Sequence, residues 1–181
     1  MLTREEFAAA QADAARRIRA AGIAITEAEE RSVEVADFGL SRLRDEGAQI
    51  LTLVSTQRLA AKVIVLLPNQ TLPEHWHPPM GADPGKEETV RAVAGAPRLY
   101  LPGADSLREG FIPAGKEAAY TCRRECLLRP GEQMTLAPGT KHWLQAGPGG
   151  AVLFSFSTPA RDILDLFSDP AVRRVTQVAP Y

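Results

Sequence analysis

"LPEHWHPPMGADPGKEETVRAVAG", residues 72–95, contains two of the three histidines of the chain, one residue apart. In an extended segment, side chains at positions i and i+2 point to the same side, about 7 Å apart at the backbone. His75 and His77 can then converge on one ion at the usual bond length of about 2.0–2.2 Å, while Trp76 points to the opposite face. The stretch therefore predicts a metal site, and its alternative is an ordinary polar loop.

A glutamate and the third histidine complete a candidate ligand set. Glu88 begins the next strand-like run, in which Glu88, Val90 and Ala92 share one face. His142 follows "PGEQMTLAPGTK", which is typical of a strand and then a turn. All the histidine of the chain thus falls at two strand edges, where a barrel presents side chains to its mouth. Three imidazoles and one carboxylate suit manganese, iron, zinc or nickel, with open positions if the ion is octahedral.

The composition is that of an ordinary globular protein. Of 181 residues, 45% are hydrophobic and 24% charged, and the formal net charge is −1. This charge gives no electrostatic case for nucleic acid or a membrane surface as partner, and no apolar run approaches the roughly 20 residues of a membrane helix. The N-terminal residues lack the apolar core of a signal peptide. Cys122 and Cys126 do not argue for an oxidising compartment, so we expect a cytoplasmic protein.

The chain divides into a helical start and a β-rich remainder. Thr3 with Glu6, and Thr26 with Glu29, form two capping-box patterns that predict helices within residues 1–40. From about Gln49, short β-like runs broken by proline and glycine, among them "AAKVIVLLP" and "AAYTCRREC", follow at fairly regular intervals. Since no helical periodicity separates them, the pattern predicts a β-sandwich or small barrel with an N-terminal helical extension. We expect one domain, with the extension at 1–40, a barrel core at 49–158 and a tail at 159–181.

The same residues resemble a known family. "HWH", ten intervening residues and "ETVRAVAG" look like the first cupin motif, and "PGEQMTLAPGTKH" looks like the second. The longer stretches "PEHWHPPMGADPGKEET", "LRPGEQMTLAPGTKHWLQAGPGGAV" and "DLFSDP" resemble the D-lyxose isomerase family of small bacterial cupins, over roughly residues 37–169. The resemblance implies an all-β fold, the jelly-roll barrel or double-stranded β-helix of cupins, in a single domain spanning 1–181 that forms a homodimer.

The resemblance also implies a metal site and a reaction. The implied ligands are His75, His77, Glu88 and His142, and they would bind a divalent metal, with manganese favoured over zinc, iron, cobalt or nickel. Aldose–ketose isomerisation moves a hydrogen between adjacent carbons that each carry an oxygen, and an ion with two open positions can bind both oxygens. The expected reaction therefore interconverts D-lyxose and D-xylulose, with D-mannose and D-fructose as a second pair.

Lys86 is the candidate that would shuttle the proton. It lies two residues before Glu88 and shares its face if the strand extends that far, whereas Glu87 would point away. The resemblance implies an acidic residue, the proton-transfer base of the family, at the position of Ser155, and a serine hydroxyl cannot act as a carboxylate base. The candidates for contacts to the sugar are Trp76, Arg91, Ser155 and Asp165. The aspartates of "RDILDLFSDP" either anchor the tail over the site opening or serve as caps and turns.

Two other functions remain open. A metal-dependent dioxygenase would use the same ligands with an aromatic pocket wall, as Trp76 and the missing acidic residue favour. A non-catalytic sugar-binding cupin would keep the ion and have lost the base. The pocket wall discriminates between the enzymes, because an isomerase needs a base and polar groups for several hydroxyls.

Overall fold

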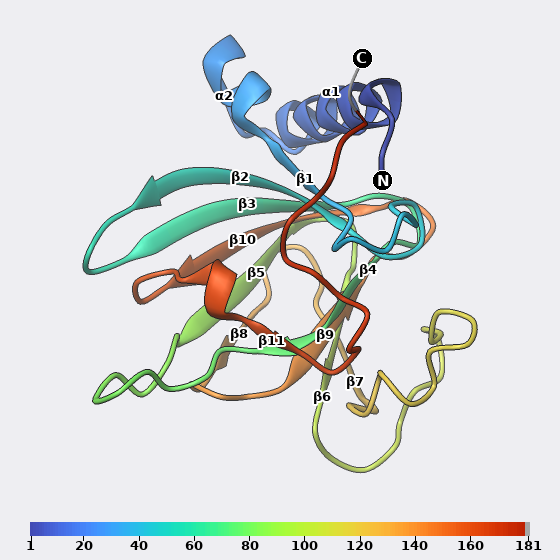
Figure 1. Cartoon of the computed structure of the whole chain (residues 1–181), viewed down its shortest axis with the longest axis vertical. Coiled ribbons are helices and arrows are strands. Elements are labelled where there is room, and N and C mark those ends of the chain that lie inside the picture. Colours follow the sequence, from blue (N-terminus) through green and yellow to red (C-terminus); the bar gives the residue numbers. More distant parts are fainter. Residues whose placement is uncertain (180–181) are drawn as a thin grey trace.

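Two antiparallel sheets face each other in the computed structural model, which describes residues 1–179 (Figure 1). In spatial order, the six-stranded sheet comprises β1 (Glu34–Ala36), β2 (Ala48–Ser55), β3 (Ala60–Leu66), β10 (Ala151–Ser157), β5 (Glu88–Ala94) and β8 (Gln133–Leu136). The five-stranded sheet comprises β11 (Leu166–Phe167), β4 (Thr71–Trp76), β9 (His142–Gln145), β6 (Arg98–Leu101) and β7 (Arg124–Leu127). This arrangement is a jelly-roll barrel, so the predicted all-β fold is confirmed.

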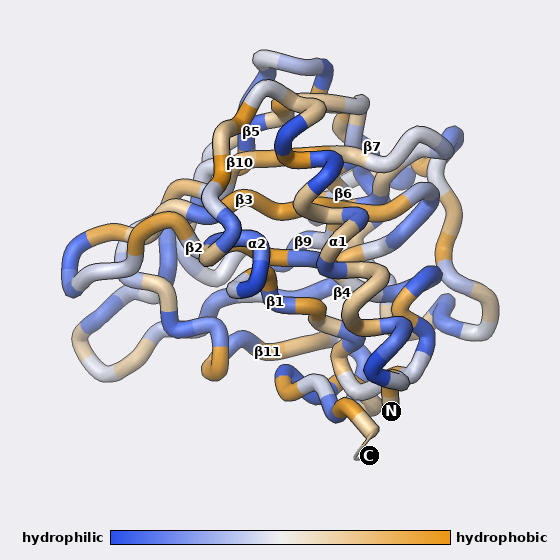
Figure 2. Tube along the Cα trace, turned by 90° about the horizontal axis from the view of Figure 1, so that it is seen from above, coloured by the Kyte–Doolittle hydropathy of each residue, from blue (hydrophilic) through white to orange (hydrophobic). Residues whose placement is uncertain are grey.

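Two helices cover part of the outer face of the six-stranded sheet (Figure 1). α1 (Arg4–Ala20) and α2 (Glu27–Ser32) both begin with the predicted capping boxes, in which Thr3 and Thr26 accept the amide of the third helical residue. Ile18 of α1 packs against Leu51 and Val63 of the sheet. Figure 2 shows the hydrophobic runs of β2, β3 and β10 in this layer, beside the more polar helices. Among residues 1–179, no helix is both long and apolar enough to cross a membrane.

Apolar side chains from both sheets fill the space between them. On β5, Glu88, Val90 and Ala92 are buried, while the residues between them are partly exposed, so the predicted alternation is confirmed. The large apolar side chains that the other strands contribute are Ile50, Ile64, Leu66, Leu72, Leu99, Leu101, Leu136, Leu144 and Leu153. Each such side chain contributes about 1.5–3 kcal/mol by its burial. Together they form the core between the two sheets.

The strand that carries the first histidine contains a β-bulge. In the pairing of β4 with β9, Leu72 and His75 lie opposite residues that are only two positions apart, so Pro73 and Glu74 together face one residue. The extra residue reverses the alternation of side chains along β4. Leu72 and His75 therefore both point between the sheets, while Glu74 points outward. A bulge is also one of the few places where a strand tolerates proline.

One expected strand is shorter than predicted. The run "AAYTCRREC" is a strand only from Arg124, because the residues before it belong to a long loop, 102–123, that is held by side chains rather than by a ladder. Glu125 accepts the backbone amides of residues 108–110 of this loop. Cys122 lies in the loop and Cys126 on β7, and both thiols are free. The tail contributes a single 3₁₀ turn, η1 (Asp162–Leu164), and the short strand β11.

Candidate metal centre

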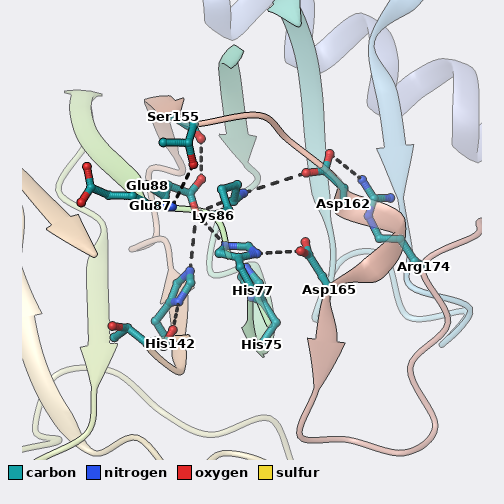
Figure 3. A network of polar contacts seen from close by, with 12 residues as sticks. His75, His77, Lys86, Glu87, Glu88, His142, Ser155, Asp162, Asp165 and Arg174 are labelled. Carbon is teal, nitrogen blue, oxygen red and sulfur yellow. Dashed lines mark hydrogen bonds and ion pairs between the residues drawn. The ribbon is translucent and has the colours of Figure 1, made fainter. Parts of the chain in front are cut away.

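Three histidines and a glutamate meet between the two sheets (Figure 3). The five-stranded sheet supplies His75 on β4, His77 just after it and His142 on β9, and the six-stranded sheet supplies Glu88 on β5. One ligand atom from each of the four lies within 4.8 Å of the other three, and all four residues are buried. The ring centroids of His75 and His142 are 4.3 Å apart. The four residues that the sequence predicted as ligands are thus brought together.

Each imidazole is oriented by a hydrogen bond at Nδ1. In His75 and His142, Nδ1 lies 2.8 Å from the carbonyl oxygen two residues earlier in the chain. In His77, Nδ1 lies 2.6 Å from Oδ1 of Asp165. These oxygen acceptors place a proton on Nδ1, so that Nε2 of each ring is left for a metal. Outer hydrogen bonds of this kind accompany nearly all metal-binding histidines.

Burial and charge set the ionisation of the cluster. Burial lowers the pKa of His142 to about 4, and it lowers the pKa of His75 well below its ordinary value, helped by the neighbouring imidazoles. Both rings are therefore neutral at pH 7, the form that binds a metal. Burial also lowers the pKa of His77, but hydrogen bonds to two carboxylates outweigh it and the net shift is upward. Burial raises the pKa of Glu88, yet Lys86 and the histidines bring it well below its ordinary value, so this carboxylate is ionised.

The donor set fits a divalent metal ion. Three nitrogen donors and a carboxylate are ligands for manganese, iron, cobalt, nickel and zinc alike. Oε2 of Glu88 lies 3.0 Å from Nε2 of His77 and 3.8 Å from Nε2 of His142, so these atoms face one point. Oε1 of Glu88 accepts the hydroxyl of Ser155 on β10. The cluster can therefore hold a metal, and its residues alone do not select which one.

The cluster lines a cavity whose other lining side chains are in part apolar and in part charged. The polar residues that line it beside the ligands are Lys62, Lys86, Ser155, Asp162, Asp165 and Arg174. Nζ of Lys86 lies 3.3 Å from Oε2 of Glu88 and 3.9 Å from Oδ1 of Asp162. Figure 3 shows Lys86 between these two carboxylates, with its side chain turned into the site. Glu87 is exposed and points away, as predicted.

Relatives of the chain identify its family. D-lyxose ketol-isomerase of Cohnella laeviribosi is 48% identical over 171 residues, which cover 94% of this chain and 94% of that protein. The chain belongs to the D-lyxose ketol-isomerase family. A second D-lyxose ketol-isomerase, from Thermofilum sp., is 43% identical over 98% of this chain and 99% of that protein. The D-lyxose/D-mannose isomerase of Thermosediminibacter oceani is 44% identical over 89% of this chain and 90% of that protein. No protein-family model matches the chain.

Solved structures show the same cupin fold outside this D-lyxose ketol-isomerase family. The L-ribose isomerase of Cellulomonas parahominis superposes with a TM-score of 0.81 and 17% identity, over 98% of each chain. The L-ribose isomerase of Acinetobacter sp. DL28, solved in complex with L-ribose, gives the same TM-score, identity and coverage. At this identity the likeness concerns the fold.

The candidates for catalysis and sugar binding are divided between two places in this D-lyxose ketol-isomerase family member. Lys86, Ser155 and Asp165 line the cavity with the ligands. The ring of Trp76, by contrast, lies 4.8 Å from Nζ of Lys141, on the face of β4 opposite His75. Arg91 donates to Gln133 at 2.9 Å on the outer face of β5. Sugar contacts by Trp76 and Arg91 stay predictions, which these positions do not support.

Sequence reasoning missed two cations of the cavity wall. Lys62 projects from β3 and donates to Asp162. Arg174, in the C-terminal segment, donates to Glu34 and lies 3.7 Å from Oδ2 of Asp162. A signal for Lys62 was present, because it is the one charged residue in the apolar run "AAKVIVLL". Asp162 and Asp165 do hold the tail over the site, whereas Asp169 pairs with Lys116.

Proposed function

We propose that this chain is a metal-dependent aldose–ketose isomerase that interconverts D-lyxose and D-xylulose, with D-mannose and D-fructose as a second pair. The observation that carries the proposal is a buried set of three Nε2 atoms and one carboxylate that faces a charged cavity wall. A sugar with several hydroxyls needs such a wall. Two relatives are named for D-lyxose, and one for D-lyxose and D-mannose.

The metal would be held by His75, His77, Glu88 and His142. When bound, a divalent ion would polarise the carbonyl of the sugar and stabilise negative charge on its two adjacent oxygens. We propose manganese, because an octahedral ion with four protein ligands keeps two positions for these oxygens. Ser155 and Asp165 would hold Glu88 and His77 in the orientation that binds the ion.

Lys86 is the proposed proton carrier between substrate atoms. Its Nζ lies directly beside a proposed metal ligand, at 3.3 Å from Glu88, and its side chain is only 9% exposed. A substrate bound beside Glu88 would therefore contact the ammonium group. Ser155 donates to Glu88, so it does not replace the acidic residue that the family carries at this position.

The wall of the cavity supports an isomerase over the two other functions. A dioxygenase for an apolar substrate would need a mainly aromatic wall around the metal, but Trp76 lies on the other face of β4, and Phe38 and Phe167 share the cavity with several charged side chains. A cupin that had lost its base would lack ionisable groups beside the ligands. Lys86, Asp162 and Asp165 are such groups, and the tail supplies the two aspartates.

Ketose formation tests the proposal. The manganese-loaded protein is incubated with D-lyxose and with D-mannose, and D-xylulose and D-fructose are quantified by chromatography. We expect both ketoses, with the protein carrying His77→Ala as the inactive control. Failure with both sugars, across manganese, cobalt, nickel, iron and zinc, would refute the function. In deuterated water, deuterium at C1 of the ketose would indicate proton transfer through a protein group.

We also propose one domain spanning 1–181, a homodimer and a cytoplasmic location. The dimer is supported by Leu53 and Phe156 of the six-stranded sheet and Leu59 of the adjoining turn, large apolar side chains that remain exposed. Sedimentation equilibrium tests it: the mass should be twice that of the chain, and the mass of a single chain would refute the dimer.

A further inference from the structure

A lysine lies buried in the wall of the cavity, in the middle of an apolar strand. Lys62 of β3 has a side chain that is 9% exposed, and its neighbours along the strand are alanines, valines and isoleucine. Burying an ammonium group is costly unless it is paired. Its partner is Asp162 of η1, and both line the cavity that contains His75, Glu88 and His142. The lysine is thus held in the site and not on the surface.

Lys62 lies on the same sheet as Glu88, two strands away, and lines the same cavity. It pairs in register with Ser155 of β10, which in turn pairs with Val90 of β5, the strand of Glu88. Two strand spacings, or roughly 10 Å, therefore separate Lys62 from the backbone of β5. Lys86 and Asp162 lie between, since Lys86 is 3.3 Å from Glu88 and 3.9 Å from Asp162. A sugar with its first two oxygens at the metal ligands would extend toward Lys62.

The charges on this wall favour a hydroxyl over a phosphate. The cavity is lined by three cations, Lys62, Lys86 and Arg174, and by three carboxylates, Glu88, Asp162 and Asp165. A phosphate beside Lys62 would also face the carboxylate of Asp162, and like charges repel. A hydroxyl can accept a hydrogen bond from the ammonium and donate one to the carboxylate. The pair therefore matches an uncharged sugar.

From this placement, we propose that the Lys62–Asp162 pair binds the terminal hydroxyl of the sugar and makes the site selective for that end of the chain. The proposal rests on the proposed function, because it takes the reacting end of the sugar to lie at the metal ligands. It assigns Lys62 to substrate specificity and leaves the chemistry to the groups beside Glu88.

The test compares D-lyxose with 5-deoxy-D-lyxose, which lacks the terminal hydroxyl. In the unmodified protein we expect kcat/KM for the deoxy sugar to be lower by about ten- to a hundredfold, the size of a hydrogen bond to a charged group. In Lys62→Met, kcat/KM for D-lyxose should fall to a similar level. The kcat/KM values for the two sugars should then differ by no more than about twofold. Differences in ring form between the sugars are common to both proteins. They cancel when the ratio of the two kcat/KM values is compared between the unmodified protein and Lys62→Met.

A binding measurement without turnover provides a second readout. Calorimetry with the open-chain polyol D-arabinitol, on metal-loaded protein, should show about tenfold or more weaker binding to Lys62→Met. Arg58→Met is the matched control, because it removes an exposed cation from the adjoining β2–β3 turn and should bind the polyol unchanged. Lys62→Arg keeps a cation and should restore part of the selectivity.

The outcomes separate the two proposals. If the unmodified protein converts D-lyxose and 5-deoxy-D-lyxose equally well, the inference is wrong, even if Lys62→Met fails to fold. A folded Lys62→Met that keeps the full preference also overturns it. If neither sugar is converted but polyol binding still depends on Lys62, the isomerase proposal fails and the role of Lys62 in binding stands.

Discussion

Each ligand of the candidate metal centre has a second polar atom, and that atom is already hydrogen-bonded. The three Nδ1 atoms contact two carbonyl oxygens and Asp165, and Oε1 of Glu88 accepts from Ser155. A side chain fixed at both atoms cannot turn away from the shared point. The site is thus organised by the protein itself, which reduces the conformational entropy that metal binding would otherwise lose.

Removing one imidazole should remove the metal. We expect His77→Ala to lose its divalent ion on dialysis, because one of four ligands is missing and Glu88 loses its closest nitrogen neighbour. Metal content is measured by plasma mass spectrometry. Arg91→Ala, on the outer face of β5, should keep full metal content. Full metal content in His77→Ala would contradict the ligand assignment.

Replacing Lys86 should slow the reaction without emptying the site. We expect Lys86→Met to lower kcat by about 10²–10⁴-fold, the usual contribution of a general acid or base, with metal content unchanged. Steady-state kinetics with D-lyxose measure the effect, and Lys86→Arg tests whether charge alone suffices. A kcat within about threefold of the unmodified protein would show that another group carries the proton.

The spacing of the motif made the metal ligands predictable, but no motif marks the cations of the cavity wall. His75 and His77 lie two residues apart, so strand periodicity predicts one side for both, and Glu88 begins the next predicted strand. Lys62 and Arg174 come from distant segments, and only the strand order β3–β10–β5 and the return of the tail bring them to the cavity. Such long-range neighbours are set by tertiary packing, which one sequence does not contain.

Among the elements, loop 102–123 is held by hydrogen bonds to two carboxylates, the partly exposed Glu125 and the buried Glu74, in place of strand pairing. Glu125 accepts three loop amides and the hydroxyl of Tyr100. Glu74 accepts from Thr121, from the amide of Cys122 and from Ser168. Carboxylates accept hydrogen bonds strongly only when ionised, so the loop should loosen in acid.

The pKa of Glu125 sets the pH range in which the loop should loosen. Burial raises its pKa, but the amides of residues 108–110 and the Tyr100 hydroxyl lower it by more, so the folded pKa lies below the ordinary value. The stability it contributes is therefore full above the unfolded pKa of about 4.3 and is lost as the pH falls through the folded pKa. Glu125→Gln should be less stable than the unmodified protein at pH 7, with a difference that shrinks below about pH 4.

Urea unfolding of the metal-free proteins, at pH 7 and below about pH 4, measures this difference in the free energy of unfolding. Glu117→Gln is the control, since Glu117 is an exposed carboxylate of the same loop and its replacement should change little at either pH. A Glu125→Gln deficit that stays constant from pH 7 to below pH 4 would show that the ionised carboxylate is not what holds the loop.

The type of most elements could be predicted, but not the irregularities between them. Capping boxes predicted both helix starts, and short β-like runs broken by proline and glycine predicted most strands. Pro73 is compatible with a bulge but does not specify one, because the bulge is defined by the pairing of β4 with β9. The run "AAYTCRREC" has side chains that suit a strand, but contacts of Thr121 and Cys122 to the buried carboxylate of Glu74 hold its first part in the loop.

In the whole molecule, the metal centre joins the two sheets. Glu88 comes from one sheet and the three histidines from the other, so a bound ion would link both halves of the barrel. An ion at about 100 times its Kd adds about 2.7 kcal/mol to the free energy of unfolding, or roughly 5–10 °C in Tm for a chain of this size. Chelation should lower Tm by that amount in a thermal scan.

The histidine variant provides the control for this scan. His77→Ala should show the same Tm with and without chelator, because it no longer binds the ion. If the unmodified protein melts at the same temperature with and without chelator, although the chelator has removed its metal, the ion does not link the sheets.

Because of the bulge in β4, metal binding depends on the number of residues between Leu72 and the first histidine. Loss of one codon between Leu72 and His75 would only remove the bulge, whereas loss of both, those of Pro73 and Glu74, would leave the motif H-x-H intact, along with its spacing to Glu88. The strand would then alternate regularly from Leu72, and both imidazoles would turn to the outer face. A homologue with that deletion would still match any motif search while being unable to assemble the centre. Across relatives, the length of the segment before the first histidine is therefore as informative about metal binding as the histidines themselves.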